Sequence, residues 1–229
     1  MPSTSSIMSS ISSTILCSEE IARAWAEEII SLNAVKFSLK KPFQWSSDRL
    51  SPIYCDNRAL LSDDRVRRKV LVLLEEVGRK NFPKTEVIAG VATSGIPYAS
   101  LLADRWEKPL VYVRPTPKSH GLKKAVEGRI KPGQRVLIVE DVISTGGSVL
   151  RVAKYLKDEG VQIEGVISLL HYELEEARQL QGAEDLNVLA LCTFSILKEL
   201  ACEKGLISGE DADKITEALK FPPEQKIYR

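Results

Sequence analysis

The chain has few of the residues from which metal centres and disulfide frameworks are built. Its 229 residues include two histidines and four cysteines, and no CxxC pair occurs among Cys17, Cys55, Cys192 and Cys202. A zinc site or a disulfide scaffold is therefore not expected, and we predict a reducing, cytoplasmic environment.

Excess charge of one sign and long apolar runs are also missing. The 32 basic and 31 acidic residues leave a net charge of +1, which gives no general attraction to nucleic acid or to membranes. No apolar run approaches the roughly 20 residues that cross a bilayer. The serine-rich residues 1–16 contain no lysine or arginine, which favours a disordered extension over a targeting signal.

The rest of the chain, residues 17–229, is predicted to form one α/β domain. Helical spacing of apolar residues indicates helices at 18–32, 63–80, 96–106, 147–160 and within 196–220. Short apolar runs indicate strands at 86–92, 109–114, 135–141, 161–170 and 186–194. Strands that alternate with helices predict a parallel five-stranded core sheet flanked by helices on both faces.

The stretch "VLIVEDVISTGGSVL" at 136–150 places two carboxylates, Glu140 and Asp141, at the end of a buried strand. The run Ser144, Thr145, Gly146, Gly147 and Ser148 follows, at the start of a helix. Glycines and free backbone N–H groups at a helix start can hold a phosphate, whereas carboxylates prefer hydroxyl donors or a metal. A sugar 5-phosphate with free hydroxyls satisfies both halves, although a purely structural helix cap and turn is the plainer alternative.

The same stretch resembles the phosphoribosyl-pyrophosphate (PRPP) motif of type I phosphoribosyltransferases. Two further segments, "GVATSGIPYASLLADRWEKPLVYVRPTPKSHGLKKAVEG" and "SPIYCDNR", resemble the orotate branch of that superfamily. The resemblance covers about residues 30–195. It implies the type I fold, with a core at about 61–195 and a small hood built from about 17–60 and the C-terminal part.

The resemblance also implies roles for individual residues. Glu140 and Asp141 would bind the ribose hydroxyls, and residues 144–148 the 5-phosphate. The PRPP-binding residues would be completed by Thr93, Ser94, Gly95, Arg114, Lys118 and His120. Lys118, His120, Arg114 and Asp141 would be the catalytic residues, and Tyr54, Ser46 and Ser144 would bind orotate.

The composition of the segment 114–131 indicates a loop that is either functional or disordered. It carries six basic residues against one acid, Glu127. The resemblance implies that this loop closes over pyrophosphate from the neighbouring subunit of a homodimer, and that Mg²⁺ is held mainly by PRPP and water, with no direct protein ligand.

The chain departs from some members of that branch at positions that bear on the base. Ser46 stands where some have a lysine, and His171 near where some have an arginine close to the orotate carboxylate. Ser94, Pro115 and Ser119 replace charged residues of other members. The group that neutralises orotate is therefore left open by the sequence.

We expect the activity implied by the resemblance, transfer of a phosphoribosyl group from PRPP to orotate in pyrimidine biosynthesis. Two alternatives stand beside it. One is a phosphoribosyltransferase for another base, and the other is a PRPP-sensing regulator that binds nucleic acid. The near-neutral charge argues against a nucleic-acid partner, and so against the regulator.

Overall fold

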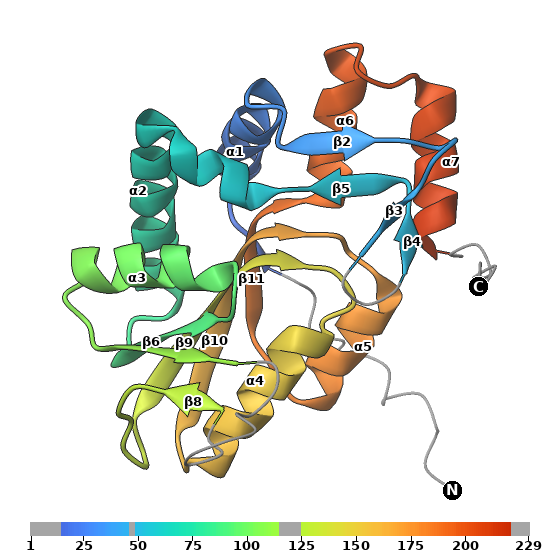
Figure 1. Ribbon diagram of the computed structural model, residues 1–229. Coiled ribbons are helices and arrows are strands. Elements are labelled where there is room, and N and C mark those ends of the chain that lie inside the picture. The colour runs from blue at the N-terminus through green and yellow to red at the C-terminus, as the bar shows by residue number, and fades with distance from the viewer. Residues whose placement is uncertain (1–14, 46–48, 115–124, 221–229) are drawn as a thin grey trace, which may run out of the picture.

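A computed structural model describes residues 15–45, 49–114 and 125–220 (Figure 1). Its central sheet has seven strands in the order β1-β11-β10-β9-β6-β7-β8. These are β1 (Ile15–Leu16), β6 (Val87–Val91), β7 (Leu110–Val113), β8 (Val126–Glu127), β9 (Arg135–Ile143), β10 (Gln162–His171) and β11 (Val188–Thr193). All neighbouring pairs are parallel except β7 with β8.

Seven α-helices and two small sheets complete the described part of the chain. The helices are α1 (Glu19–Ser31), α2 (Asp64–Asn81), α3 (Gly95–Arg105), α4 (Gly147–Asp158), α5 (Glu175–Ala183), α6 (Phe194–Glu203) and α7 (Gly209–Lys220), and a 3-10 helix, η1, spans Asn57–Ser62. The small sheets pair β2 (Val35–Phe37) with β5 (Ile53–Cys55), and β3 (Phe43–Gln44) with β4 (Leu50–Ser51), both antiparallel. None of these helices is long and apolar enough to cross a membrane.

The core strands are apolar on both faces because helices cover both faces. On β9, Leu137 and Val139 join a cluster with α1, α2 and α3, whereas Val136 and Ile138 join a second cluster with α4 and α5. Figure 1 shows the same two layers of helices on either side of the sheet. A buried parallel sheet of this kind explains why the strands read as continuous apolar runs.

The five predicted core strands are all present as β6, β7, β9, β10 and β11, and the fold class is confirmed. The predicted number of strands was too small, because β1 and β8 add one strand at each edge. Ile15 and Leu16 pair with Leu189 and Ala190 of β11, so the structured chain begins before residue 17. Two-residue strands carry no periodicity, and their partners lie far away in sequence.

Three other features differ from the sequence-based expectation. Helix α5 was not predicted, the C-terminal helical region divides into α6 and α7, and residues 33–58 contain strands β2 to β5. Helix α1, which we expected in the hood, packs against core strand β11 and against α6. Its Ser18 caps it as predicted, since the Ile21 N–H donates to the Ser18 hydroxyl at 3.3 Å.

Candidate active site

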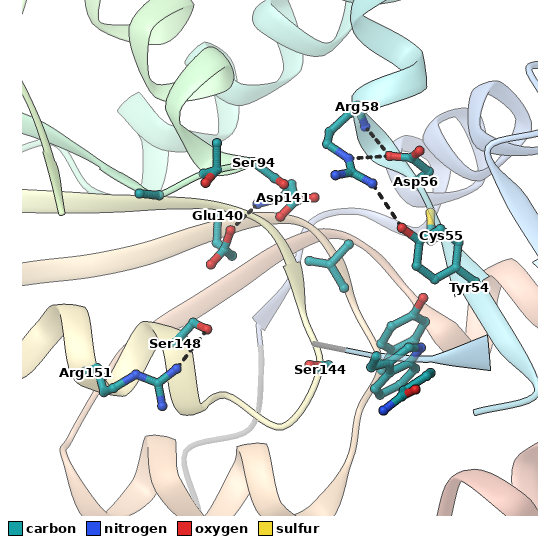
Figure 2. Close-up of a pocket in the computed structure, with 16 residues that line it drawn as sticks. Tyr54, Cys55, Asp56, Arg58, Ser94, Glu140, Asp141, Ser144, Ser148 and Arg151 are labelled. Atoms are coloured by element: carbon teal, nitrogen blue, oxygen red, sulfur yellow. Dashed lines mark hydrogen bonds and ion pairs between the residues drawn. The ribbon is translucent and has the colours of Figure 1, made fainter. Parts of the chain in front are cut away.

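A pocket of about 570 Å³ opens between the small hood sheets and the carboxyl ends of β6 and β9 (Figure 2). Its lining includes seven residues that the sequence had singled out: Tyr54, Thr93, Ser94, Glu140, Asp141, Ser144 and Ser148. Ligands of open parallel sheets bind beyond the carboxyl ends of the strands, which is where this pocket lies.

Glu140 and Asp141 form the floor of the pocket at the end of β9. Glu140 is 5% exposed, and its carboxylate accepts a hydrogen bond of 3.0 Å from the Asp141 backbone N–H. Burial raises the pKa of Glu140 well above its usual range, and the neighbouring charge of Asp141 raises it further. Burial also raises the pKa of Asp141. Hydroxyl donors or a cation would relieve this confined negative charge.

The loop that follows β9 is shaped to receive an anion. Gly146 caps α4 with a φ of 81°, a conformation that favours glycine. No side chain caps the first N–H groups of α4, and Ser144–Ser148 line a second cavity of about 340 Å³. Arg151 lies one turn into α4, and its guanidinium donates to the Ser148 hydroxyl at 3.4 Å. Backbone donors, the helix dipole and a cation therefore meet at one place.

The loop after β6 lies directly beside the carboxylates. Thr93 and Ser94 line the pocket, and α3 begins at Gly95. A Cβ atom on Gly95 would lie 2.5 Å from the Val139 carbonyl oxygen and 3.3 Å from the Glu140 Cα. Only glycine lets the α3 N-terminus approach β9 this closely.

The opposite wall is aromatic and combines Trp45 and Tyr54 of the hood with Tyr172, which follows core strand β10. Trp45 stacks on Tyr172 with ring centroids 4.7 Å apart and an interplanar angle of 11°. The Tyr54 hydroxyl accepts a hydrogen bond of 3.0 Å from Arg58. Arg58 also donates to the Asp56 carboxylate at 2.7 Å. Aromatic rings with a cation beside them suit a flat, anionic ligand.

Asn57 joins the hood to the floor of the site. Its side-chain N–H donates to the Asp141 backbone carbonyl at 2.9 Å, and its own backbone carbonyl accepts a hydrogen bond of 2.5 Å from the Tyr98 hydroxyl. Asn57 is fully buried, and its contact with Tyr98 is buried as well, whereas the contact with Asp141 is partly buried. Tyr54 and Arg58 are therefore carried by a segment that is attached to β9 and α3.

Other predicted site residues lie elsewhere. Arg114 follows β7, where its guanidinium is 4.0 Å from the Glu127 carboxylate, and it does not line either cavity. Ser46, Lys118 and His120 lie outside the described residues. Thr145, Gly146 and Gly147 line the smaller cavity only.

His171 is a core residue. It is fully buried, its Nδ1 accepts the Glu173 N–H at 2.8 Å, and its Nε2 lies 2.9 Å from the Gln181 side chain. Burial lowers its pKa to about 4, so the ring is neutral at pH 7. It therefore supplies no cation to the pocket.

Sequence reasoning assigned no site role to Trp45, Asn57, Arg58, Arg151 or Tyr172. Arg151 had a readable signal, because it lies three residues after Ser148 on the helix that the phosphate loop begins. Arg58 stands in the quoted segment "SPIYCDNR". The pairing of Trp45 with Tyr172 had no local signal, since 127 positions separate them in the chain.

Comparisons with known proteins agree with this geometry. The family model for the phosphoribosyl transferase domain matches residues 56–187. Orotate phosphoribosyltransferase of Bacillus cereus (strain G9842) is 40% identical over 200 residues, which cover 87% of this chain and 95% of that protein. The enzyme of that name from Cutibacterium acnes is 44% identical over 191 residues, 83% of this chain and 88% of that protein.

A solved structure agrees as well. Orotate phosphoribosyltransferase from Aeropyrum pernix superposes with a TM-score of 0.64 at 33% identity, covering 77% of this chain and 99% of that one. The matched domain model includes the carboxylate pair and the loop Ser144–Ser148, whereas Trp45 and Tyr54 precede it. The chain belongs to the orotate phosphoribosyltransferase family of the phosphoribosyltransferases.

Proposed function

We propose that this protein transfers the 5-phosphoribosyl group of PRPP to orotate, which yields orotidine 5-monophosphate and pyrophosphate. One observation carries the proposal. The pocket that contains the carboxylate pair and the aromatic wall with its cation also contains Ser144 and Ser148, and the rest of their loop lines the adjoining smaller cavity. The loop and the carboxylates suit a ribose 5-phosphate, and the aromatic wall with its cation suits a flat, acidic base.

In this proposal the PRPP half of the site works mainly through backbone groups. The N-terminus of α4 and the hydroxyls of Ser144 and Ser148 receive the 5-phosphate, with Arg151 as an added cation. Glu140 and Asp141 accept hydrogen bonds from the ribose hydroxyls. The N-terminus of α3, at Thr93–Gly95, receives the pyrophosphate.

The reaction needs stabilisation of a departing anion more than it needs a strong base. The bond between C1 and pyrophosphate loosens first, and the ribose ring takes on oxocarbenium character beside the negative carboxylates. The base nitrogen then attacks C1 from the opposite face, and its electron pair forms the new bond while its proton passes to solvent. Pyrophosphate leaves with the electron pair of the broken C1–O bond. Charge stabilisation and alignment supply most of the rate, and loss of one such contact costs about 3 kcal/mol of barrier.

The donor set fits a Mg²⁺ ion whose ligands come mainly from the substrate. Among the described residues, no cluster of three or more histidine, cysteine or acidic side chains could hold a metal. Glu140 and Asp141 offer hard carboxylate oxygens next to the place proposed for the ribose, and Mg²⁺ typically uses few carboxylates together with waters and substrate phosphates. When bound, the ion would neutralise charge on pyrophosphate.

We also propose a homodimer in which Arg114, Lys118 and His120 act on the pyrophosphate of the neighbouring subunit. Arg114 supports this, because it pairs with Glu127 and does not line the cavities of its own chain. Mixing Lys118→Ala subunits with Asp141→Asn subunits should restore activity through hybrid sites. If activity does not recover after verified subunit exchange, that result contradicts action across subunits.

The cytoplasmic location stays a prediction, which the four free cysteines support.

The direct test of the function is an absorbance assay of orotate consumption with PRPP and Mg²⁺. Uracil, adenine and guanine serve as control bases in parallel reactions. Orotate should be consumed only when PRPP is present, and pyrophosphate should appear in equal amount. Consumption of another base in preference to orotate would overturn the proposal.

A further inference from the structure

The chemistry of orotate restricts where its carboxylate can lie. The carboxylate is bonded to the ring carbon next to the nitrogen that attacks C1 of the ribose. In a reactive complex it must therefore lie at the border between the base wall and the ribose-binding carboxylates. A third negative charge beside Glu140 and Asp141 is unfavourable unless a cation faces it.

Among the described residues, the pocket is lined by only two basic side chains, Arg58 and Arg151. Arg151 belongs to the phosphate end, since it contacts Ser148 and also lines the smaller cavity around the loop. His171 is buried in the core and lines neither cavity. Arg58 is therefore the described cation on the base side.

Arg58 occupies the border that the chemistry requires. Its Nη2 donates to the Tyr54 hydroxyl, and Figure 2 shows its guanidinium between Tyr54 and Asp141. Burial raises the pKa of Asp141, and the positive charge of Arg58 opposes part of this rise, which places the two groups within electrostatic reach. The side chain is 54% exposed, so a ligand can reach it.

The orientation of Arg58 is fixed before any ligand binds. Its Nε donates to Asp56 at 2.7 Å, while the neighbouring Asn57 is bonded to the Asp141 backbone. A guanidinium has five N–H donors, and these contacts use only part of them. A pre-oriented fork of donors is well suited to a carboxylate.

We propose that Arg58 recognises the carboxylate of orotate and so sets the preference of this site for an acidic pyrimidine. The inference rests on the proposed function and assigns a residue to a step that the sequence left open. It involves no covalent chemistry, because Arg58 only binds and orients the base.

The test compares Michaelis constants for the two substrates. Arg58→Gln should raise the KM for orotate about 10- to 100-fold, the effect of losing a hydrogen bond to a charged group, with little change in the KM for PRPP. Arg58→Lys keeps the charge but loses the fork, and it should recover part of the affinity for orotate. A thermal melt of each variant checks the fold.

Two matched controls remove other positive charges. Arg151→Gln should show the opposite pattern, with a raised KM for PRPP and little change for orotate. Arg68→Gln removes an exposed arginine that pairs with Asp64 on α2, and both constants should stay at the wild-type value. This pair separates loss of a particular contact from loss of charge in general.

Two results would overturn the inference. An unchanged KM for orotate in folded Arg58→Gln would remove Arg58 from base recognition. Equal increases for both substrates, without partial recovery in Arg58→Lys, would make Arg58 a structural or pyrophosphate-side residue. Failure of the proposed function itself looks different, because the wild-type protein would then not consume orotate.

Discussion

The two halves of the proposed active site, one for PRPP and one for the base, are built in different ways. The PRPP half lies at the carboxyl ends of core strands and consists of loops, helix N-termini and two adjacent carboxylates. The base half consists mainly of side chains from the hood, which contact the core across long sequence distances, as Trp45 does with Tyr172. The first half is formed by short continuous segments, whereas the second is formed by segments that lie far apart in the sequence.

This difference teaches where function can be read from a sequence. A phosphate cradle needs glycines, hydroxyls and a helix start in one continuous segment, so it leaves a motif. An aromatic wall needs only that rings from distant segments meet after folding. Changes in the PRPP half should therefore be severe and specific to PRPP, and changes in the hood milder and specific to the base.

Asp141→Asn should have the largest effect and tests the PRPP half. It removes the charge that accepts the ribose hydroxyls, and we expect kcat/KM for PRPP to fall about 100-fold or more, the size seen for one charge-stabilising group. Thermal stability should stay the same or rise, because burial disfavours this charge in the free protein. Steady-state kinetics and a thermal melt measure both. Unchanged PRPP kinetics in the folded variant would remove Asp141 from the site.

The next prediction concerns His171, which we expect to contribute to stability and not to ligand binding. Its folded-state pKa is about 4, below the unfolded value of 6.5, so the unfolded chain binds the proton more readily. Its contribution to stability is complete above pH 6.5 and is lost as the pH falls toward 4. Between pH 7.5 and 5, the wild type should lose about 2 kcal/mol more unfolding free energy than His171→Gln.

Urea titrations of both proteins at the two pH values measure this difference, and other titrating groups cancel in the comparison. Parallel loss of stability in wild type and variant would show that His171 is already protonated in the folded state. Such a result would reopen its role as a cation near the base.

Asn57→Ala tests the connection between the halves and should have an intermediate effect. The substitution leaves the Asp141 backbone carbonyl and the Cys55 thiol without the Asn57 side chain, while the Tyr98 contact with the backbone is kept, and it should cost about 1–3 kcal/mol of stability. Unlike a change in either half, it should raise the KM values for both orotate and PRPP. An effect on one substrate only would mean that the hood is positioned independently of β9. Asn81→Ala, which loses a single contact to the Val77 carbonyl within α2, serves as the control.

Tyr54→Phe should have the smallest effect and tests the hood. It keeps the ring and removes only the hydroxyl that accepts a hydrogen bond from Arg58. Loss of a hydrogen bond worth about 1 kcal/mol should raise the KM for orotate roughly fivefold. The KM for PRPP should not change. A larger rise in the KM for PRPP than in the KM for orotate would mean that this wall contacts PRPP and not the base.

The sequence was sufficient for the core and insufficient for its edges. Five strands and the helices α1 to α4 were predictable, because strong apolar periodicity reflects burial on two faces of a sheet. Strands β1 and β8 escaped, because pairing between two-residue segments depends on partners far away in the chain. Helix α5 was also missed, although its apolar face contributes Ala177 to the core.

The same contrast applies within the site. Seven predicted residues line one pocket, because their roles derive from a continuous motif or from loops at strand ends. Arg58 could not be assigned from the sequence, since its relevance depends on lying between Tyr54 and Asp141 in space. His171 shows the reverse case, in which a position next to the site in sequence is sealed in the core.

The close approach of Gly95 to the Val139 carbonyl sets the spacing between the N-terminus of α3 and strand β9. Because main chain lies against main chain there, the distance between the start of α3 and the backbone of β9 does not depend on any side-chain rotamer. A single methyl group at position 95 would increase that spacing, since it would lie 2.5 Å from a backbone oxygen atom that has no rotamer to change. In the proposed site, the leaving group and the sugar would therefore bind at a spacing that two adjacent backbones set, with no side chain between them to adjust it.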